Sequence, residues 1–533
     1  MVSKEQNIFL DYSTNPPTRT TAGKEFLENV VTDIEGPVYT FYDSMSPMVI
    51  AAAMARLSRR GSDAREILLD EFALDSDDVI GLFQRVVSGY GDDSVQQLVG
   101  QHIVVENASN LLTKKLEWGR FGSYLEQSTR YIFFDELDQN GKYKYFIPEN
   151  FDDSTTKKYV ENLDQIFENY SKMARDLTLY VRENSDKPSD PSDRSAWLAA
   201  TRAQACDAIR TVLPVATKST VGIFASAQAI ENLVIRLTAD RLIEARHVGK
   251  SILQEVRKVM PVFYERADRP DRGMATSAYL ASKKSTIEEI VSKLDQSHDI
   301  ENDPVVLSGY WPENELDIIP DILFSESTIS TEGLKQITNK ISEEEKIAIL
   351  NTYMGERHNR RHRPGRAMEF PHYKFEITAD YGTFRDLQRH RVVDGFEWQK
   401  LTSSHGYDIP KLVQEAGMTE TFIECFDLSE KLVNYLINEG YEEESQYATL
   451  LGHKMRYRFM INAREAFHLI ELRTQPQGHP GYRKIANIMF ELIKEKHPNI
   501  ASAMHFVNTS EDPELTRLAA EKATQFKLNN LSS

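Results

Sequence analysis

The spacing of apolar residues predicts a chain built mainly from helices joined by polar turns. Apolar side chains recur at three- and four-residue intervals, the period of a helix with one buried face. In the first half this spacing predicts helices at 48–57, 64–72, 77–87, 202–236 and 241–260. In the second half it predicts helices at 318–323, 331–341, 343–353, 462–473 and 482–497. Alternation of apolar and polar residues predicts strands at 99–105 and 373–377.

One polar stretch, Leu116–Tyr131, stands out because it concentrates hydroxyls, a carboxylate and guanidinium groups in a few residues. We expect it to be a loop between a helix at 108–117, capped by Asn107 or Ser109, and a strand at 131–134. Arginine forks and serine hydroxyls on such a loop suit an anionic ligand. A polar surface loop with a local ion pair is the alternative.

The order of predicted elements starts again after residue 304. Placing Trp118 on Arg389 aligns strand with strand and helix with helix, at an offset of 271. Placing Arg236 on Arg473 gives an offset of 237, so the first half carries 34 extra residues (271 minus 237), most simply within 149–201. Two halves of like order indicate a duplication and a pseudo-twofold architecture, like a symmetric dimer fused head to tail.

The same pattern divides the chain into five segments. We expect a polar N-terminal arm at 1–36, a first unit at 37–264, a linker at 265–304 with a short helix at 286–294, a second unit at 305–509, and a polar tail at 510–533.

The composition argues against several classes of protein: membrane-spanning, disulfide-rich secreted and general nucleic-acid-binding proteins. No apolar run approaches the length of a membrane span, and the N-terminus lacks the apolar core of a signal peptide. Only two cysteines are present, Cys206 and Cys425, which excludes a disulfide framework and a cysteine-built zinc site; we expect no metal site and a reducing, cytoplasmic location. The net charge of −18 argues against general nucleic-acid binding.

Two further basic clusters are candidates for chemistry. Arg389-His390-Arg391 ends a predicted helix and could bind a pyrophosphate, although cations also favour helix C-termini through the dipole. Asn462, Arg464, His468 and Arg473 lie along one late helix, which could equally be a solvated helix edge. The loop 357–366 holds five arginines and could cradle phosphates, or simply be a solvated basic loop.

Taken together, these motifs resemble the flavin-dependent thymidylate synthases. That family carries Arg-His-Arg, two residues, Ser, one residue, Asn-Glu, one residue, Ser, one residue, Arg-Tyr, and later Asn-x-Arg with a further Arg nine residues on. The first half reads Trp118-Gly119-Arg120, Ser123, Leu125-Glu126, Ser128 and Arg130-Tyr131. The second half reads Arg389-His390-Arg391, Asp394, Phe396-Glu397, Gln399 and Leu401-Thr402. The late motif is intact at Asn462, Arg464 and Arg473, whereas the first half has Ala225-Ser226-Ala227 and keeps only Arg236.

The resemblance implies a composite site, because what one half lacks the other tends to keep. The first half would hold the nucleotide and the second the flavin, with Ser128 and Arg473 as the catalytic residues. The implied substrate-binding set is Lys115, Arg120, Ser123, Glu126, Ser128, Arg130, Arg210 and Arg473. The implied FAD-binding set is Arg389, His390, Arg391, Asn462, Arg464 and His468.

The reaction implied is reductive methylation of dUMP to dTMP, with methylenetetrahydrofolate as carbon donor, NADPH as reductant and FAD as cofactor. The implied fold is α+β, with two tandem units that each have a central sheet flanked by long helices, and the implied assembly is a homodimer that mimics the family tetramer. Two alternatives stay open: a flavoenzyme of the same scaffold acting on another pyrimidine nucleotide, and a non-catalytic nucleotide- or flavin-binding protein.

Overall fold

A computed structural model describes residues 7–57, 60–72, 94–294 and 303–510, together with the single residues 518, 522 and 526. The helix predicted at 77–87 and most of the tail at 510–533 lie outside these residues. The described chain mixes helices with small sheets and divides into two compact units. Unit 1 comprises 1–108, 115–126 and 220–295, and unit 2 comprises 109–114, 127–219 and 296–533.

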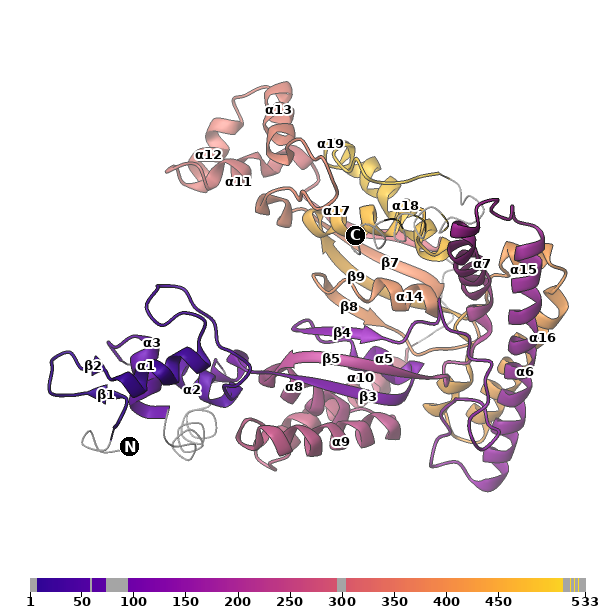
Figure 1. Cartoon of the computed structure of the whole chain (residues 1–533). Coiled ribbons are helices and arrows are strands. Elements are labelled where there is room, and N and C mark those ends of the chain that lie inside the picture. The colour runs from indigo at the N-terminus through magenta and orange to yellow at the C-terminus, as the bar shows by residue number, and fades with distance from the viewer. Residues whose placement is uncertain are drawn as a thin grey trace. The chain divides into compact units, whose positions relative to one another are not determined.

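Unit 1 is built on a three-stranded sheet in the order β3-β5-β4. Its strands are β3 (Gly100–Ser109), β4 (Gly122–Glu126) and β5 (Lys218–Ser226), and β4 runs antiparallel to β5. Helix α8 (Ala227–Thr238) follows β5 and packs against α9 (Ile243–Val259) and α10 (Gly273–Ser292) (Figure 1). The N-terminal part adds β1 (Leu10–Asp11), β2 (Thr18–Arg19), α1 (Thr21–Val30), α2 (Pro47–Leu57) and α3 (Ala64–Ile67).

Unit 2 is built on a four-stranded antiparallel sheet in the order β6-β7-β9-β8. The strands are β6 (Val305–Trp311), β7 (His372–Asp380), β8 (Asp394–Trp398) and β9 (Lys454–Asn462). Alternate residues of β7 and β9 are buried, and their registered pair Phe375 and Phe459 illustrates the apolar face. Helix α18 (Pro480–Lys496) packs on β6 and β7, and α17 (Ala463–Arg473) packs against α18.

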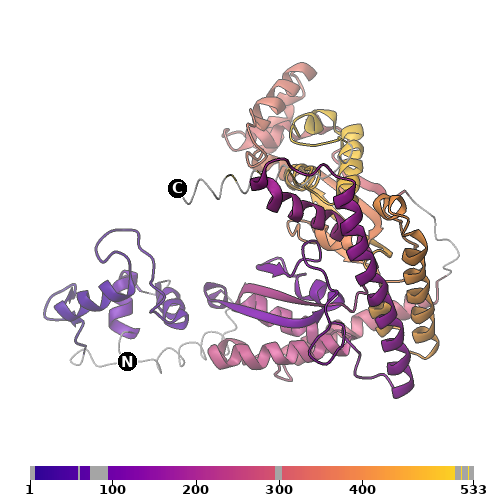
Figure 2. The same ribbon diagram turned by 45° about the vertical axis from the view of Figure 1, so that its right-hand side comes forward.

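The long helices of unit 2 form a layer of their own. Helix α6 (Asp153–Glu183) packs against both α7 (Arg194–Ile209) and α16 (Thr419–Asn438). Figure 2 shows α6, in purple, from the side along its length. The short helices of this unit are α5 (Asn110–Leu116, whose last two residues belong to unit 1), α11 (Ile319–Phe324), α12 (Thr331–Thr338), α13 (Glu343–Met354), α14 (Tyr381–Leu387), α15 (Lys411–Glu415) and α19 (Pro498–Ser502).

The internal repeat is visible in the strand order. The order β3-β5-β4 in unit 1 matches β7-β9-β8 in unit 2. The first residues of β3 and β7 are 272 apart (372 minus 100), and those of β5 and β9 are 236 apart (454 minus 218). The N-caps of α8 and α17 are Ser226 and Asn462, whose side chains accept from the third residue beyond. At this point the offset is therefore 236, and serine rather than alanine stands opposite Asn462.

Several predicted elements differ from the structure. The strand expected at 131–134 is wrong, and a strand lies at 122–126 inside the stretch expected to be a loop. The single helical region expected at 202–236 is also wrong, because β5 separates α7 from α8; its burial alternates residue by residue, as a sheet face requires. The arm expected at 1–36 contains helix α1, and the linker expected at 265–304 contains the 20-residue helix α10.

The helices predicted at 241–260 and 482–497 correspond to α9 and α18, whereas α16, β6, β8 and β9 were not predicted. The strands expected at 99–105 and 373–377 correspond to β3 and β7, and Ser109 caps α5 by accepting from Leu112 N–H at 3.0 Å. Among the described residues, no helix is both long and apolar enough to cross a membrane.

Candidate functional site

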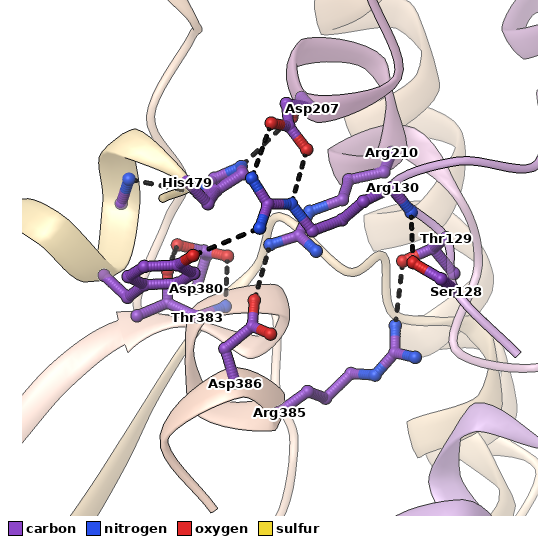
Figure 3. A network of polar contacts seen from close by, with 12 residues as sticks. Ser128, Thr129, Arg130, Asp207, Arg210, Asp380, Thr383, Arg385, Asp386 and His479 are labelled. Atoms are coloured by element: carbon purple, nitrogen blue, oxygen red, sulfur yellow. Dashed lines mark hydrogen bonds and ion pairs between the residues drawn. The ribbon is translucent and has the colours of Figure 1, made fainter. Parts of the chain in front are cut away.

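A cluster of arginines and carboxylates lies in unit 2, where residues from both halves of the sequence meet (Figure 3). Arg130 donates through Nε and Nη2 to the Asp207 carboxylate, at 2.7 and 2.8 Å, and through Nη1 to the Tyr482 hydroxyl at 3.1 Å. Burial opposes the charge on Arg130, but the hydrogen bonds to Asp207 outweigh it and raise the arginine pKa. Helix α7 thus supplies the carboxylate that holds Arg130 in one orientation.

Arg210 is the second arginine of the cluster and follows α7 directly. Its Nη2 donates to the Asp386 carboxylate of α14 at 3.3 Å, and both side chains are more than nine-tenths buried. Its Nε is buried and has no hydrogen-bond partner among the described residues. Although burial raises the pKa of Asp386, Arg210 and the nearby Arg473 more than offset this and hold it well below its usual range. The site therefore contains an unused donor, Arg210 Nε, beside the ionised Asp386 carboxylate, which is already paired with Arg210 Nη2.

Arg473, in the last turn of α17, connects this cluster to a histidine. Its Nε donates to His390 Nε2 at 2.9 Å, and its Nη2 donates to the Asp386 backbone carbonyl at 2.6 Å. The guanidinium carbon lies 5.1 Å from the centre of the Tyr482 ring, within cation–π range. Burial lowers the pKa of Arg473.

The bond from Arg473 fixes the protonation state of His390. Because His390 Nε2 accepts a hydrogen bond, it must carry a lone pair, and the ring proton of the neutral imidazole therefore sits on Nδ1. That Nδ1 faces Glu465 Oε1 at 3.3 Å, which is the acceptor this tautomer needs. Burial lowers the pKa of His390 to about 4, in agreement with a neutral ring.

Glu465 joins His390 to His468, whose Nδ1 lies 3.0 Å from the same carboxylate oxygen. Burial would raise the pKa of Glu465, but the bonds from the two histidines outweigh it and lower the pKa to about 2. Two imidazoles and a carboxylate this close could in principle ligate a metal ion. Arg473 beside His390 and Arg363 at 3.9 Å from Glu465 make the surroundings cationic, which favours the hydrogen-bonded network over a cation.

Smaller contacts complete the cluster. Ser128 Oγ accepts from the Arg130 backbone N–H at 3.2 Å, and the neighbouring Thr129 hydroxyl accepts from Arg385 at 3.4 Å. His479 accepts at Nδ1 from Gly481 N–H and therefore donates from Nε2 to the Asp207 carbonyl at 3.1 Å. Burial lowers the pKa of His479 to about 3, so this ring is also neutral.

The residues expected to hold a flavin lie at two places in unit 2. Arg389 is exposed and Arg391 half-buried, and they flank buried His390 in the turn after α14. Asn462 caps α17 by accepting from Glu465 N–H at 2.8 Å, and Arg464 Nε donates to the Pro364 carbonyl at 2.9 Å. The structure brings His390 and His468 together, with ring centres 5.3 Å apart.

Four residues expected to bind substrate belong to unit 1 and are described there by themselves. Lys115 forms an ion pair with Asp240 at 2.6 Å. Arg120 is exposed, and Ser123 and Glu126 lie on β4, opposite Phe224 and Val221 of β5. The other expected substrate residues, Ser128, Arg130, Arg210 and Arg473, all belong to unit 2.

The sequence motifs did not reveal the residues that orient these side chains. They are Asp207, Asp386, Glu465, His479 and Tyr482. Two signals were present in the sequence: Asp207 precedes Arg210 by three residues, and Glu465 precedes His468 by three, the spacing of neighbours on a helix surface.

Comparison with known proteins agrees with the repeat and the motifs. A family profile described as "Thymidylate synthase complementing protein" matches residues 40–262 and 309–499. The chain belongs to this family. Because the profile matches twice, the thymidylate synthase complementing domain is present as a tandem duplication, and the motif differences above show that its halves have diverged.

Individual relatives fall into two groups. A UPF0159 protein of Chlamydia muridarum is 32% identical over 520 residues, covering 93% of this chain and 97% of that protein. A flavin-dependent thymidylate synthase of Clostridium tetani is 26% identical over 224 residues, covering 41% of this chain and 82% of that protein. A crystal structure of the UMP/dUMP methylase PolB from Streptomyces cacaoi, bound with 5-Br dUMP, covers 39% of this chain and 96% of its own at 15% identity; its TM-score of 0.31 is too low to inform the fold.

Proposed function

We propose that this protein is a flavin-dependent thymidylate synthase whose working site is assembled from both halves of one chain. The reaction would be reductive methylation of dUMP to dTMP, with FAD as cofactor, methylenetetrahydrofolate as carbon donor and NADPH as reductant. One observation supports this above the others: Arg130 and Arg210 from the first half and Arg473 from the second belong to one compact unit and share Asp386 as an electrostatic partner.

In this proposal the arginines bind and polarise the nucleotide. Arg210 contributes positive charge to the phosphate site, and Asp207 holds Arg130 so that its remaining N–H groups keep one direction. Ser128 adds a short hydroxyl donor beside Arg130. Arg473 would place its charge at the pyrimidine carbonyl, where it stabilises the electron-rich form that attacks carbon.

The chain's residues fit a flavin at the second cluster. Arg389 and Arg391 suit a pyrophosphate, and Val392 between them and the sheet is 65% exposed, which offers apolar surface to a ring. His390 would carry its proton on Nδ1, and Asn462, Arg464 and His468 would complete the set. The bound FAD would supply the hydride chemistry that the protein's own side chains lack.

The test is the visible spectrum of the purified protein reconstituted with FAD while dUMP is titrated in. We expect a flavin spectrum that shifts on addition of dUMP, and dTMP formation when folate and NADPH follow. Arg473→Ala should remove the dUMP-dependent shift, whereas Arg236→Ala, which removes a guanidinium from the last turn of α8 in unit 1, should keep it. Equal loss in both variants, or no flavin retention with dUMP present, would overturn the assignment; a colourless protein that still binds dUMP would indicate a binding protein.

The proposal also includes the assembly. A fused pair of family domains needs one further copy to reproduce a four-domain arrangement, so we expect a homodimer. Light scattering on the purified chain distinguishes a dimer of about 122 kDa, twice the 61.1 kDa chain, from a monomer.

A further inference from the structure

The arginine-rich loop at 357–366 contacts the site described above through Arg363 and Pro364, and its first residues border a separate cavity. The cavity has a volume of about 410 Å³ and is lined by His358, Asn359, Arg360, Gln475, His505, Phe506, Val507 and Asn508. The cavity is open to solvent on one side rather than enclosed. None of the described residues that line it is acidic, although the whole chain has a net charge of −18.

The loop is anchored firmly at both ends. Arg357 is buried and donates through Nη1 and Nη2 to the Glu471 carboxylate of α17, at 2.6 Å each, and to the Ala503 carbonyl at 2.9 Å. At the other end, the Pro364 carbonyl accepts from Arg464 of the same helix. A loop tied twice to one helix loses little further entropy when a ligand binds.

Between the anchors, the backbone folds into a tight turn. The Asn359 carbonyl accepts from His362 N–H at 3.0 Å, and the Asn359 side-chain oxygen accepts from Arg361 N–H at 2.9 Å. His358 and Arg360 of this turn line the cavity together with His505. In the described part of the chain, no carboxylate forms an ion pair with Arg360, His358 or His505, whereas Arg366, six residues beyond Arg360, pairs with Glu369.

We infer that this cavity is a second anion site, which takes a phosphate-bearing ligand. The lining offers one guanidinium, two imidazoles and the amides of Asn359 and Asn508, and Phe506 and Val507 supply an apolar wall. The Gln475 amide donates to the Glu471 and Phe506 carbonyls, and the Asn359 amide is bonded to His362 Nε2, so most of the donors left for a ligand are on Arg360, His358 and His505. Phosphate is the anion that such a set matches, since it presents several acceptor oxygens around one centre. This inference does not depend on the proposed binding of dUMP and FAD, so either proposal can fail without the other.

The neighbouring surface limits how far the ligand extends. A second cavity of about 560 Å³ shares His505 and contains Glu356, which would repel an anion. The phosphate is therefore expected at the Arg360 side of His505 rather than on the Glu356 side.

The experiment uses isothermal titration calorimetry on the full chain in the presence of excess dUMP and FAD, so that probe binding at the proposed nucleotide and flavin sites is suppressed. Inorganic pyrophosphate and adenosine 2′,5′-bisphosphate are the probes. We expect saturable one-to-one binding to the natural chain, weakened tenfold or more in Arg360→Ala and in His505→Gln, and unchanged in Arg366→Ala, which removes the same charge from the same loop outside the cavity. Binding of both probes assigns the site to the phosphate alone, and binding of only the bisphosphate assigns it to a phosphorylated nucleoside.

Two results would overturn the inference. One is the absence of saturable binding of either probe. The other is equal weakening in Arg360→Ala and Arg366→Ala, which would mean that the loop attracts anions only through its overall charge. Circular dichroism at the same concentrations checks that each variant is folded.

Discussion

Three histidines whose pKa burial lowers strongly make the stability of unit 2 depend steeply on acid, and burial shifts the pKa of a fourth, His497, in the same direction. Burial lowers the pKa to about 4 for His390 and His453 and to about 3 for His479. In the unfolded chain each histidine titrates near its ordinary value of about 6.5. Between these values the unfolded state binds protons that the folded state does not, so stability is present above pH 6.5 and is lost as the pH falls toward 4.

The size of the effect follows from the number of protons. Between about pH 4.5 and 6 the unfolded state holds about three more protons, and each contributes about 1.4 kcal/mol per pH unit, so stability should fall by about 4 kcal/mol per unit. A typical folding free energy is about 5–15 kcal/mol, so one or two pH units consume much of it. We therefore expect the free energy of unfolding of unit 2 to be about 4–6 kcal/mol lower at pH 5 than at pH 7.

His453→Gln isolates one proton of the three. His453 is buried outside the arginine cluster, and its Nδ1 accepts from Leu450 N–H at 2.9 Å, a bond that a glutamine oxygen can also accept. Urea unfolding followed by circular dichroism from pH 5 to 7.5 should show a slope about one third smaller, by about 1.4 kcal/mol per unit. Leu450→Val, which trims a buried side chain without removing a titratable group, should lower stability at every pH and keep the slope. An unchanged slope in His453→Gln would refute the reasoning.

Three further predictions concern contacts inside unit 2. Glu471→Ala leaves Arg357 buried without its carboxylate and should lower the free energy of unfolding by about 3–5 kcal/mol, seen as a lower thermal midpoint. The double variant Arg357→Met with Glu471→Leu should recover most of that stability. A thermal midpoint of Glu471→Ala equal to that of the natural chain would contradict this. Asp207→Ala frees the Arg130 guanidinium and should weaken dUMP binding, measured by calorimetry, by about tenfold or more. The control Asp193→Ala, at the other end of α7, should leave the affinity unchanged. Equal dUMP affinities in the two variants would be inconsistent with an orienting role for Asp207. Glu465→Gln gives His390 an amide that can donate to Nδ1, and this opposes the tautomer that the bond from Arg473 requires. We therefore expect kcat to fall about tenfold or more, with a smaller change in KM. A change in KM alone would indicate that His390 only helps to bind the substrate.

The sequence predicted local elements better than the contacts between them. The alternating strands at 99–105 and 373–377 were found because one face of each is buried. Strands β5 and β9 were missed because apolar residues run into the helices that follow, and only pairing with distant strands makes them extended. The same limit applies to the site: the sequence showed the arginines, but not which carboxylate each would face, since Asp386 lies 176 residues from Arg210.

The path of the chain has an evolutionary consequence. It passes between the two compact units five times, at 108/109, 114/115, 126/127, 219/220 and 295/296. A gene cut near residue 300 would leave the C-terminal product without Arg130, Asp207 and Arg210, and the N-terminal product without Arg473. Neither copy can be lost, transferred or expressed alone without dismantling the cluster. The two halves are therefore interdependent: the residues of the cluster come together only where both halves are present, whether as one reading frame or as two products that assemble.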